Sequence, residues 1–144
     1  MTAKERLLRS LRNHLACRVS GIAVLAGLPV RPFEMVWSTT VAAAGTHGGV
    51  IYVNHDWFRE HPTDYGALTH EYVHLIQAVP GGTCPSDVIE GIADAMRYKR
   101  GEYDPWWSPS PMAAKIAALS PSCFRTLSRR MASGTYEAAL LECR

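Results

Sequence analysis

Two histidines with a glutamate between them are the first feature of this sequence that could do chemistry. In "LTHEYVHLIQ", residues 68–77, His70 and His74 are four positions apart and Glu71 follows the first of them. Side chains four positions apart lie on the same face of a helix, so both imidazoles could bind one cation. An adjacent carboxylate could accept a proton from a water molecule on that cation. The motif therefore predicts a metal site with Glu71 as general base.

A third ligand is expected on a neighbouring helix, because catalytic zinc takes three protein ligands and leaves a fourth position to water. In "VIEGIADAM", residues 88–96, the apolar side chains mark one helix face and leave Glu90 and Asp94 together on another. We predict that Glu90 binds the metal. We predict that Asp94 accepts the outer N–H of a ligand histidine, most simply that of His70. The small residues at positions 91, 93 and 95 suggest that this helix packs closely against the histidine helix.

The acidic helix also has an ordinary interpretation, in which Glu90 and Asp94 lie on a solvated face and Arg97 balances their charge. The spacing favours the metal site instead. Glu90 follows His74 by sixteen residues, and "PGG" at 80–82 provides a turn that permits an antiparallel return of the chain. We therefore predict one Zn²⁺ ion held between two helices.

The elements that must position these residues follow from periodicity and from helix and turn signals. The expected order is helix, small sheet, then mostly helices, which defines an α+β fold in a single domain over residues 1–144. We predict an amphipathic helix at 3–16, a buried strand with its turn at 19–30, strands at 33–42 and 50–54 that form a hairpin around "AGTHGG", a short helix or turn at 55–62, helices at 64–78 and 87–99, a proline-rich loop at 104–111, and short helices at 112–119, 122–131 and 135–142. Thr63 and Ser86 are the expected N-caps of the two central helices.

At these motifs the chain resembles a known family. "HEYVHLIQ" followed by "IEGIADAMRYKRG" is similar to the basic secretory protein family of plants and bacteria, whose members carry HExxHxxQ and then an EGIAD segment. The resemblance covers residues 48–103. It implies a zincin-like fold and a zinc peptidase of the gluzincin type. The matching positions are His70, His74 and Glu90 as zinc ligands, Glu71 as general base, Asp94 behind a ligand, and Gln77, for which we expect a hydrogen bond at the helix end.

The remaining parts of a peptidase site are less well defined by spacing. Tyr98, Tyr103, His47 and Arg97 are candidates for stabilising an oxyanion or binding substrate, and each has an alternative structural role. The strand at 50–54 could offer an edge to an extended peptide. Trp106 and Trp107 could line a pocket or pack under the last helices.

Composition limits the partners of this protein. The 144 residues are 47% hydrophobic with a net charge of +2, as in a soluble globular domain, and no apolar run is long enough to span a membrane. Basic residues near both ends are not interleaved with aromatic residues, so we expect no nucleic-acid binding. The four cysteines permit disulfides but lack the spacing of a cysteine zinc site. The stretch 19–30 is interrupted by glycines and makes no convincing secretion signal, although relatives are often secreted, so the compartment stays open.

The sequence therefore predicts a zinc-dependent peptidase that acts on a peptide or protein substrate. The alternative is a catalytically silent, zinc-stabilised binding module of the same fold. A structural zinc needs no general base, so the presence of Glu71 favours the enzyme. A nucleic-acid-associated protein that uses its basic terminal helices is a weaker possibility. The oligomeric state, the substrate preference and the choice between endo- and exopeptidase stay open.

Overall fold

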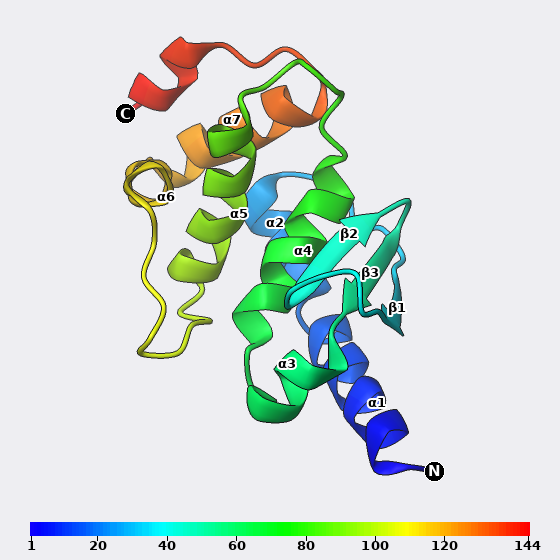
Figure 1. Ribbon diagram of the computed structural model, residues 1–144. Coiled ribbons are helices and arrows are strands. Elements are labelled where there is room, and N and C mark those ends of the chain that lie inside the picture. The colour runs from blue at the N-terminus through cyan, green and yellow to red at the C-terminus, as the bar shows by residue number, and fades with distance from the viewer.

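The computed structural model describes residues 1–144 and has the α+β architecture expected from the sequence, with two helices before a small sheet and a mainly helical part after it (Figure 1). In chain order the elements are α1 (Ala3–Ala16), α2 (Val19–Ala26), β1 (Glu34–Trp37), β2 (Ala44–His47), β3 (Val50–Val53), α3 (His55–Glu60), α4 (Tyr65–Gln77), α5 (Ser86–Lys99), α6 (Pro111–Ala117), α7 (Pro121–Ala132) and the short 3₁₀ helix η1 (Ala138–Glu142).

The three strands form one sheet in the order β1-β3-β2, with β1 parallel and β2 antiparallel to β3. The predicted hairpin between strands at 33–42 and 50–54 is therefore wrong in its pairing. Gly48 and Gly49 have φ angles of 58° and 79°, which suit a two-residue turn, so the "AGTH" segment before them becomes the antiparallel partner. The first strand ends at Trp37, and bends at 39–43 bring the chain back.

Residues 19–30 contain a helix, where the sequence pattern had indicated a buried strand. In α2, the residues Ile22, Ala23 and Ala26 are buried at helical spacing, and Gly27 ends the helix with a left-handed φ of 68°. A short apolar run fits either a buried strand or a buried helix, because periodicity does not separate the two. Burial against the other helices decides in favour of the helix.

Helix α4 lies at the centre of the molecule, between the sheet and α5 (Figure 1). Ten of its 13 residues are buried, and six of these belong to a core cluster of 27 hydrophobic side chains. Its N-cap is Asp64, where Thr63 had been expected, and α5 begins at Ser86, one residue earlier than predicted. The α4 C-cap, Ala78, takes a left-handed φ of 44° before the Pro80 break.

Of the last helices, α6 packs against α5, whereas α7 packs against α2 and α4. The Cβ of an alanine at position 91 would lie 2.8 Å from Met112 and 3.1 Å from Ile116, so Gly91 permits close packing against α6; the predicted close packing against the histidine helix is wrong for this residue. A disulfide between Cys123 and Cys143 joins α7 to the chain end. No helix combines the length and the apolar character needed to cross a lipid bilayer.

Candidate metal centre

His70, His74 and Glu90 bring their ligand atoms together, all within 4.8 Å of one another. The two Nε2 atoms lie 3.0 Å apart, and the Glu90 oxygens lie 3.0 Å from His70 Nε2 and 3.2 Å from His74 Nε2. Ligands held about 2.0–2.1 Å from a tetrahedral zinc are about 3.3 Å from each other. The spacing of these three groups therefore suits a zinc ion without large rearrangement.

Two antiparallel helices create this arrangement. The turn between Ala78 and Pro85 folds α5 back along α4, so that residues twenty positions apart face each other (Figure 1). The two histidines lie one turn apart on α4, as the helix period requires. Ile92 and Met96 are fully buried on α5 and fix its rotation, which turns Glu90 and Asp94 toward the histidine side.

Asp94 contacts the outer nitrogen of His70, with Oδ1 2.6 Å from Nδ1. The carboxylate accepts, so Nδ1–H is the donor, and Nε2 is left facing the cluster. Burial alone would lower the pKa of His70, but hydrogen bonds to Asp94 and Glu90 and the negative charges of Asp94 and Glu71 together raise it to about 9. Hydrogen bonds from His70 and His74 hold the pKa of Glu90 well below its usual range.

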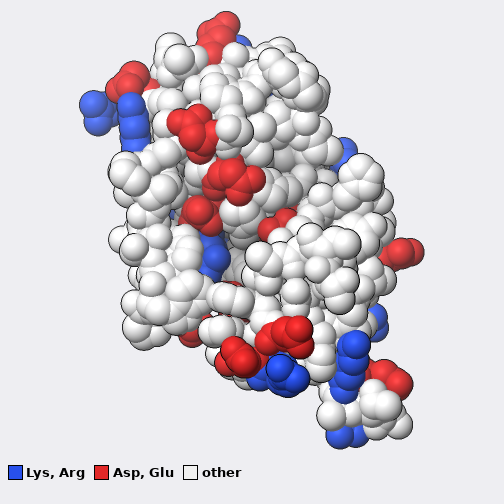
Figure 2. Space-filling model, in the orientation of Figure 1, with Lys and Arg blue, Asp and Glu red and all other residues white.

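The cluster is closed on one side and open on the other. The side chains of His70 and His74 are 14% and 19% exposed, whereas that of Glu90 is 60% exposed. Figure 2 shows acidic side chains over the junction between α4 and α5, where the surface is hollowed. A centre with three protein ligands and an open side leaves room for water and substrate, as a catalytic zinc site requires.

Glu71 lies beside the cluster and is not a member of it. Its Oε2 is 3.9 Å from His70 Nε2, and its Oε1 accepts a hydrogen bond of 2.8 Å from Thr46 Oγ1 on β2. Thr46 could not be predicted from local spacing, because the contact joins positions 25 residues apart. The carboxylate is 11% exposed and its Oε2 faces the cluster, which is where a general base would have to lie.

A cleft of about 670 Å³ lies beside His74, between β2 and the C-terminal half of α4. His47 lines it, so this sequence candidate lies next to the cluster. The lining residues are Arg31, Pro32, Thr46, His47, Gly48, Gly49, His74, Leu75, Ala78, Val79 and Ile89. The strand at its edge is β2; the suggestion that residues 50–54 offer a free edge is wrong, because β3 is the central strand.

The other sequence candidates lie away from this cleft. Tyr98, one turn beyond Asp94 on α5, stacks at 5.5 Å on Tyr103 of the following loop, and both are half-exposed. Arg97 is buried in an ion pair with Asp64 at 3.2 Å and lies under the Trp107 ring, which makes it structural.

Gln77, the family's glutamine, donates from Nε2 to Ser128 Oγ at 3.0 Å. It therefore ties α4 to α7, and the hydrogen bond expected at the helix end is replaced by a contact between helices.

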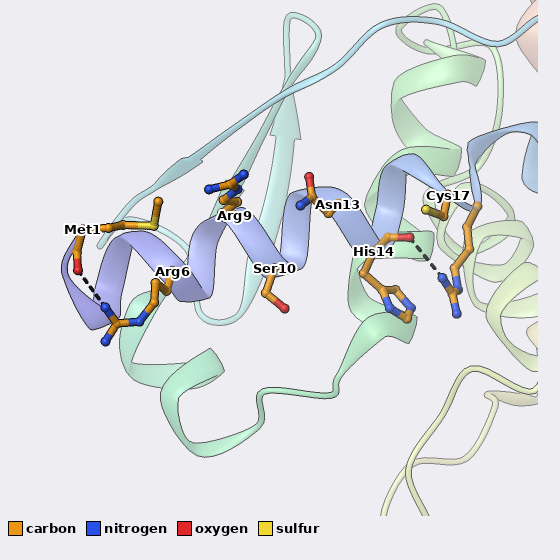
Figure 3. A pocket seen from close by; sticks show the side chains of 8 residues that line it. Met1, Arg6, Arg9, Ser10, Asn13, His14 and Cys17 are labelled. Atoms are coloured by element: carbon orange, nitrogen blue, oxygen red, sulfur yellow. Dashed lines mark hydrogen bonds between the residues drawn. The ribbon is translucent and has the colours of Figure 1, made fainter.

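A second hollow, of about 720 Å³, runs along α1 (Figure 3). Its polar contacts join side chains to the backbone, as from Arg6 to the Met1 carbonyl at 2.7 Å and from Arg18 to the His14 carbonyl at 3.1 Å. It shares no residue with the metal cluster, which is the one group of three or more histidine, cysteine or acidic side chains close enough to hold an ion.

The small sheet, the mainly helical second part and a His-His-Glu cluster across two antiparallel helices are consistent with a zincin-like arrangement. A family model described as "Peptidase of plants and bacteria" (BSP) matches residues 31–117, which is more than half of the chain. The chain belongs to this peptidase family, as its two motifs had predicted. No curated protein and no solved structure matches it.

Proposed function

We propose that residues 1–144 form one zinc-dependent metallopeptidase domain that hydrolyses peptide bonds. The observation that carries the proposal is the convergence of His70, His74 and Glu90, with Glu71 turned toward the same point. Two imidazoles and one carboxylate suit Zn²⁺, because zinc takes nitrogen and oxygen ligands in a four-coordinate site. Membership in a peptidase family supports a peptide or protein as the substrate.

Each residue has a defined part in the reaction. Zinc, when bound, would supply Lewis acidity that polarises the peptide carbonyl and makes a water molecule more acidic. Glu71 accepts the proton of that water through Oε2 and later delivers it to the leaving nitrogen. Asp94 keeps a proton on His70 Nδ1, which leaves Nε2 free as a ligand.

The cleft along β2 receives the substrate beside His74. The free edge of β2 can pair with an extended peptide, because its other edge is already paired with β3. His47, on the same strand and in the same cleft, is our candidate for stabilising the carbonyl oxygen. Tyr98 and Tyr103 would contact more distant parts of the substrate.

A paired measurement tests this function. Zinc content and cleavage of casein are measured for the wild-type protein, for Glu71→Gln, and for Glu60→Gln, which changes an exposed glutamate on α3 as a matched control. We expect one zinc per chain in all three proteins. We expect activity to fall by at least about 100-fold in Glu71→Gln alone, because a positioned general base contributes about 10²- to 10⁴-fold.

The other outcomes are equally informative. Stoichiometric zinc with no cleavage by the wild-type protein would indicate the silent binding module. Absence of bound zinc from the wild-type protein would contradict both functions.

A further inference from the structure

The hydroxyl of Thr46 is the sole hydrogen-bond donor to the Glu71 carboxylate. Thr46 Oγ1 lies 2.8 Å from Oε1 and 3.1 Å from the backbone carbonyl oxygen of the same residue. One hydroxyl has one proton, so the two acceptors compete for it. The charged carboxylate is the stronger acceptor, so the hydrogen bond to Oε1 prevails.

The two oxygens of Glu71 therefore have different surroundings. Oε1 is held by Thr46, whereas Oε2 faces the metal cluster, 3.9 Å from His70 Nε2. No lysine, arginine or backbone N–H contacts this nearly buried carboxylate. Without the hydroxyl, the carboxylate would lose its one hydrogen bond and could rotate about its side-chain bonds. A buried acceptor would then be left unpaired.

The position of Thr46 is itself fixed by the sheet. Thr46 pairs with Ile51 in the antiparallel register between β2 and β3, and Ile51 is fully buried. Because directly opposite residues of an antiparallel pair point to the same face of the sheet, Thr46 points with Ile51 toward the side on which α4 lies. The pairing of β2 with β3 thus fixes the position of the Thr46 hydroxyl, and this hydroxyl orients the Glu71 carboxylate.

We propose that Thr46 is a positioning residue, which orients Glu71 so that Oε2 points at the reacting water. This inference rests on the proposed function. Misplacement of a catalytic group by about 1 Å can cost about 100-fold in rate. The role concerns orientation alone, so substrate binding and metal binding do not depend on it.

The activity test uses Thr46→Val, which keeps the shape and removes the hydroxyl, and Thr46→Ser, which keeps the hydroxyl. The substrate is a fluorogenic peptide copied from a casein site that the wild-type protein cleaves. We expect kcat to fall about 10- to 100-fold in Thr46→Val with KM and zinc content unchanged, and Thr46→Ser to recover most of the loss. Thr40→Val, which changes an exposed threonine near the sheet, is the control and should behave as wild type. Wild-type kcat in Thr46→Val, or no recovery in Thr46→Ser, would overturn the proposal.

A second measurement needs neither zinc nor turnover. Urea unfolding of the metal-free protein is compared for the wild type, Thr46→Val, Glu71→Ala and the double variant. We expect Thr46→Val to lower the midpoint in the wild-type background, and to change it by less than half as much when Glu71 is already alanine. Equal shifts in the two backgrounds would refute the contact itself. A wild-type protein that binds zinc but cleaves nothing would refute the proposed function, and this cycle would then judge the Thr46–Glu71 contact alone.

Discussion

The imidazole of His70, on α4, contacts two carboxylates of α5. His70 donates through Nδ1 to Asp94 and holds Nε2 3.0 Å from a Glu90 oxygen. A histidine binds a metal only through an unprotonated nitrogen. Because its pKa is raised to about 9, His70 carries a second proton at neutral pH until an ion replaces it. Proton and metal therefore compete for the same atom.

We expect zinc binding to the metal-free protein at pH 7 to release about one proton. The apparent affinity should rise with pH and level off above the His70 pKa of about 9, since the competing proton is then gone. Calorimetry in two buffers of different ionisation enthalpy measures the number of protons released. Asp94→Asn removes one cause of the raised pKa of His70, so zinc binding should release fewer protons. The variant also loses the carboxylate that orients His70 and strengthens it as a ligand, and we expect this loss to outweigh the weaker proton competition, so that zinc binds about 10- to 100-fold more weakly. Zinc binding without proton release by the wild-type protein would contradict this account.

The pattern of site residues shows what a sequence can reveal at this scale. His70 and His74 were predictable because the helix period fixes their relation, and Glu90 because its helix has one clear apolar face. Thr46 and Ser128 were not predictable, because their contacts with Glu71 and Gln77 span 25 and 51 residues. Each depends on which surfaces meet in the folded chain, and no local spacing encodes that.

At the scale of elements, the start of α4 depends on a residue without a side chain. Gly66 is buried, and a Cβ at this position would overlap the Glu102 carbonyl oxygen and lie 2.6 Å from Arg97 Nε. The backbone of the loop after α5 therefore passes directly over the first turn of α4. This close approach sets how far α4 can lie from α5, and so the distance between His70 and Glu90.

Gly66→Ala should destabilise the protein by about 3 kcal/mol, because backbone atoms cannot move aside as a flexible side chain can. We also expect weaker zinc binding, since α4 must shift away from α5. The matched control is Gly81→Ala, where an added Cβ would meet nothing within 4 Å and φ is not positive. Urea unfolding and zinc titration of the two variants provide the comparison. Similar stability of Gly66→Ala and the control would show that the close approach does not position α4.

The sheet shows why element types were easier to predict than their pairing. The segment of β3 was predicted correctly from the sequence. Its role as the central strand depends on parallel pairing with β1, and β2 lies between these two strands in the chain. Strand propensity does not indicate which strands pair. The pairing matters for the proposed function, because it makes β2 a free edge of the sheet and places Thr46 and His47 in the cleft beside His74.

At the scale of the whole molecule, one buried ion pair joins the parts that carry the site. Asp64, the N-cap of α4, accepts hydrogen bonds from Arg97 of α5 at 3.2 Å and from the Trp57 indole of α3 at 2.9 Å. Trp107, from the loop after α5, covers the guanidinium at 4.2 Å. Three helices and a loop therefore meet at a single carboxylate that is 2% exposed.

Removal of one partner of the Asp64–Arg97 ion pair should lower the free energy of unfolding more than replacement of both partners. Arg97→Met leaves the Asp64 charge buried with one neutral donor, so we expect a loss of about 3–5 kcal/mol in the free energy of unfolding. The double variant Asp64→Asn/Arg97→Met keeps an acceptor for Trp57 and buries no charge, so it should recover a large part of that loss. Arg59→Met is the control, because Arg59 and its partner Asp56 are 62% and 83% exposed, and an exposed pair contributes at most about 1 kcal/mol. Urea unfolding of the metal-free proteins measures all three. A double variant no more stable than Arg97→Met would mean that the guanidinium acts through its packing under Trp107, and that the pairing of charges does not hold α4 against α5.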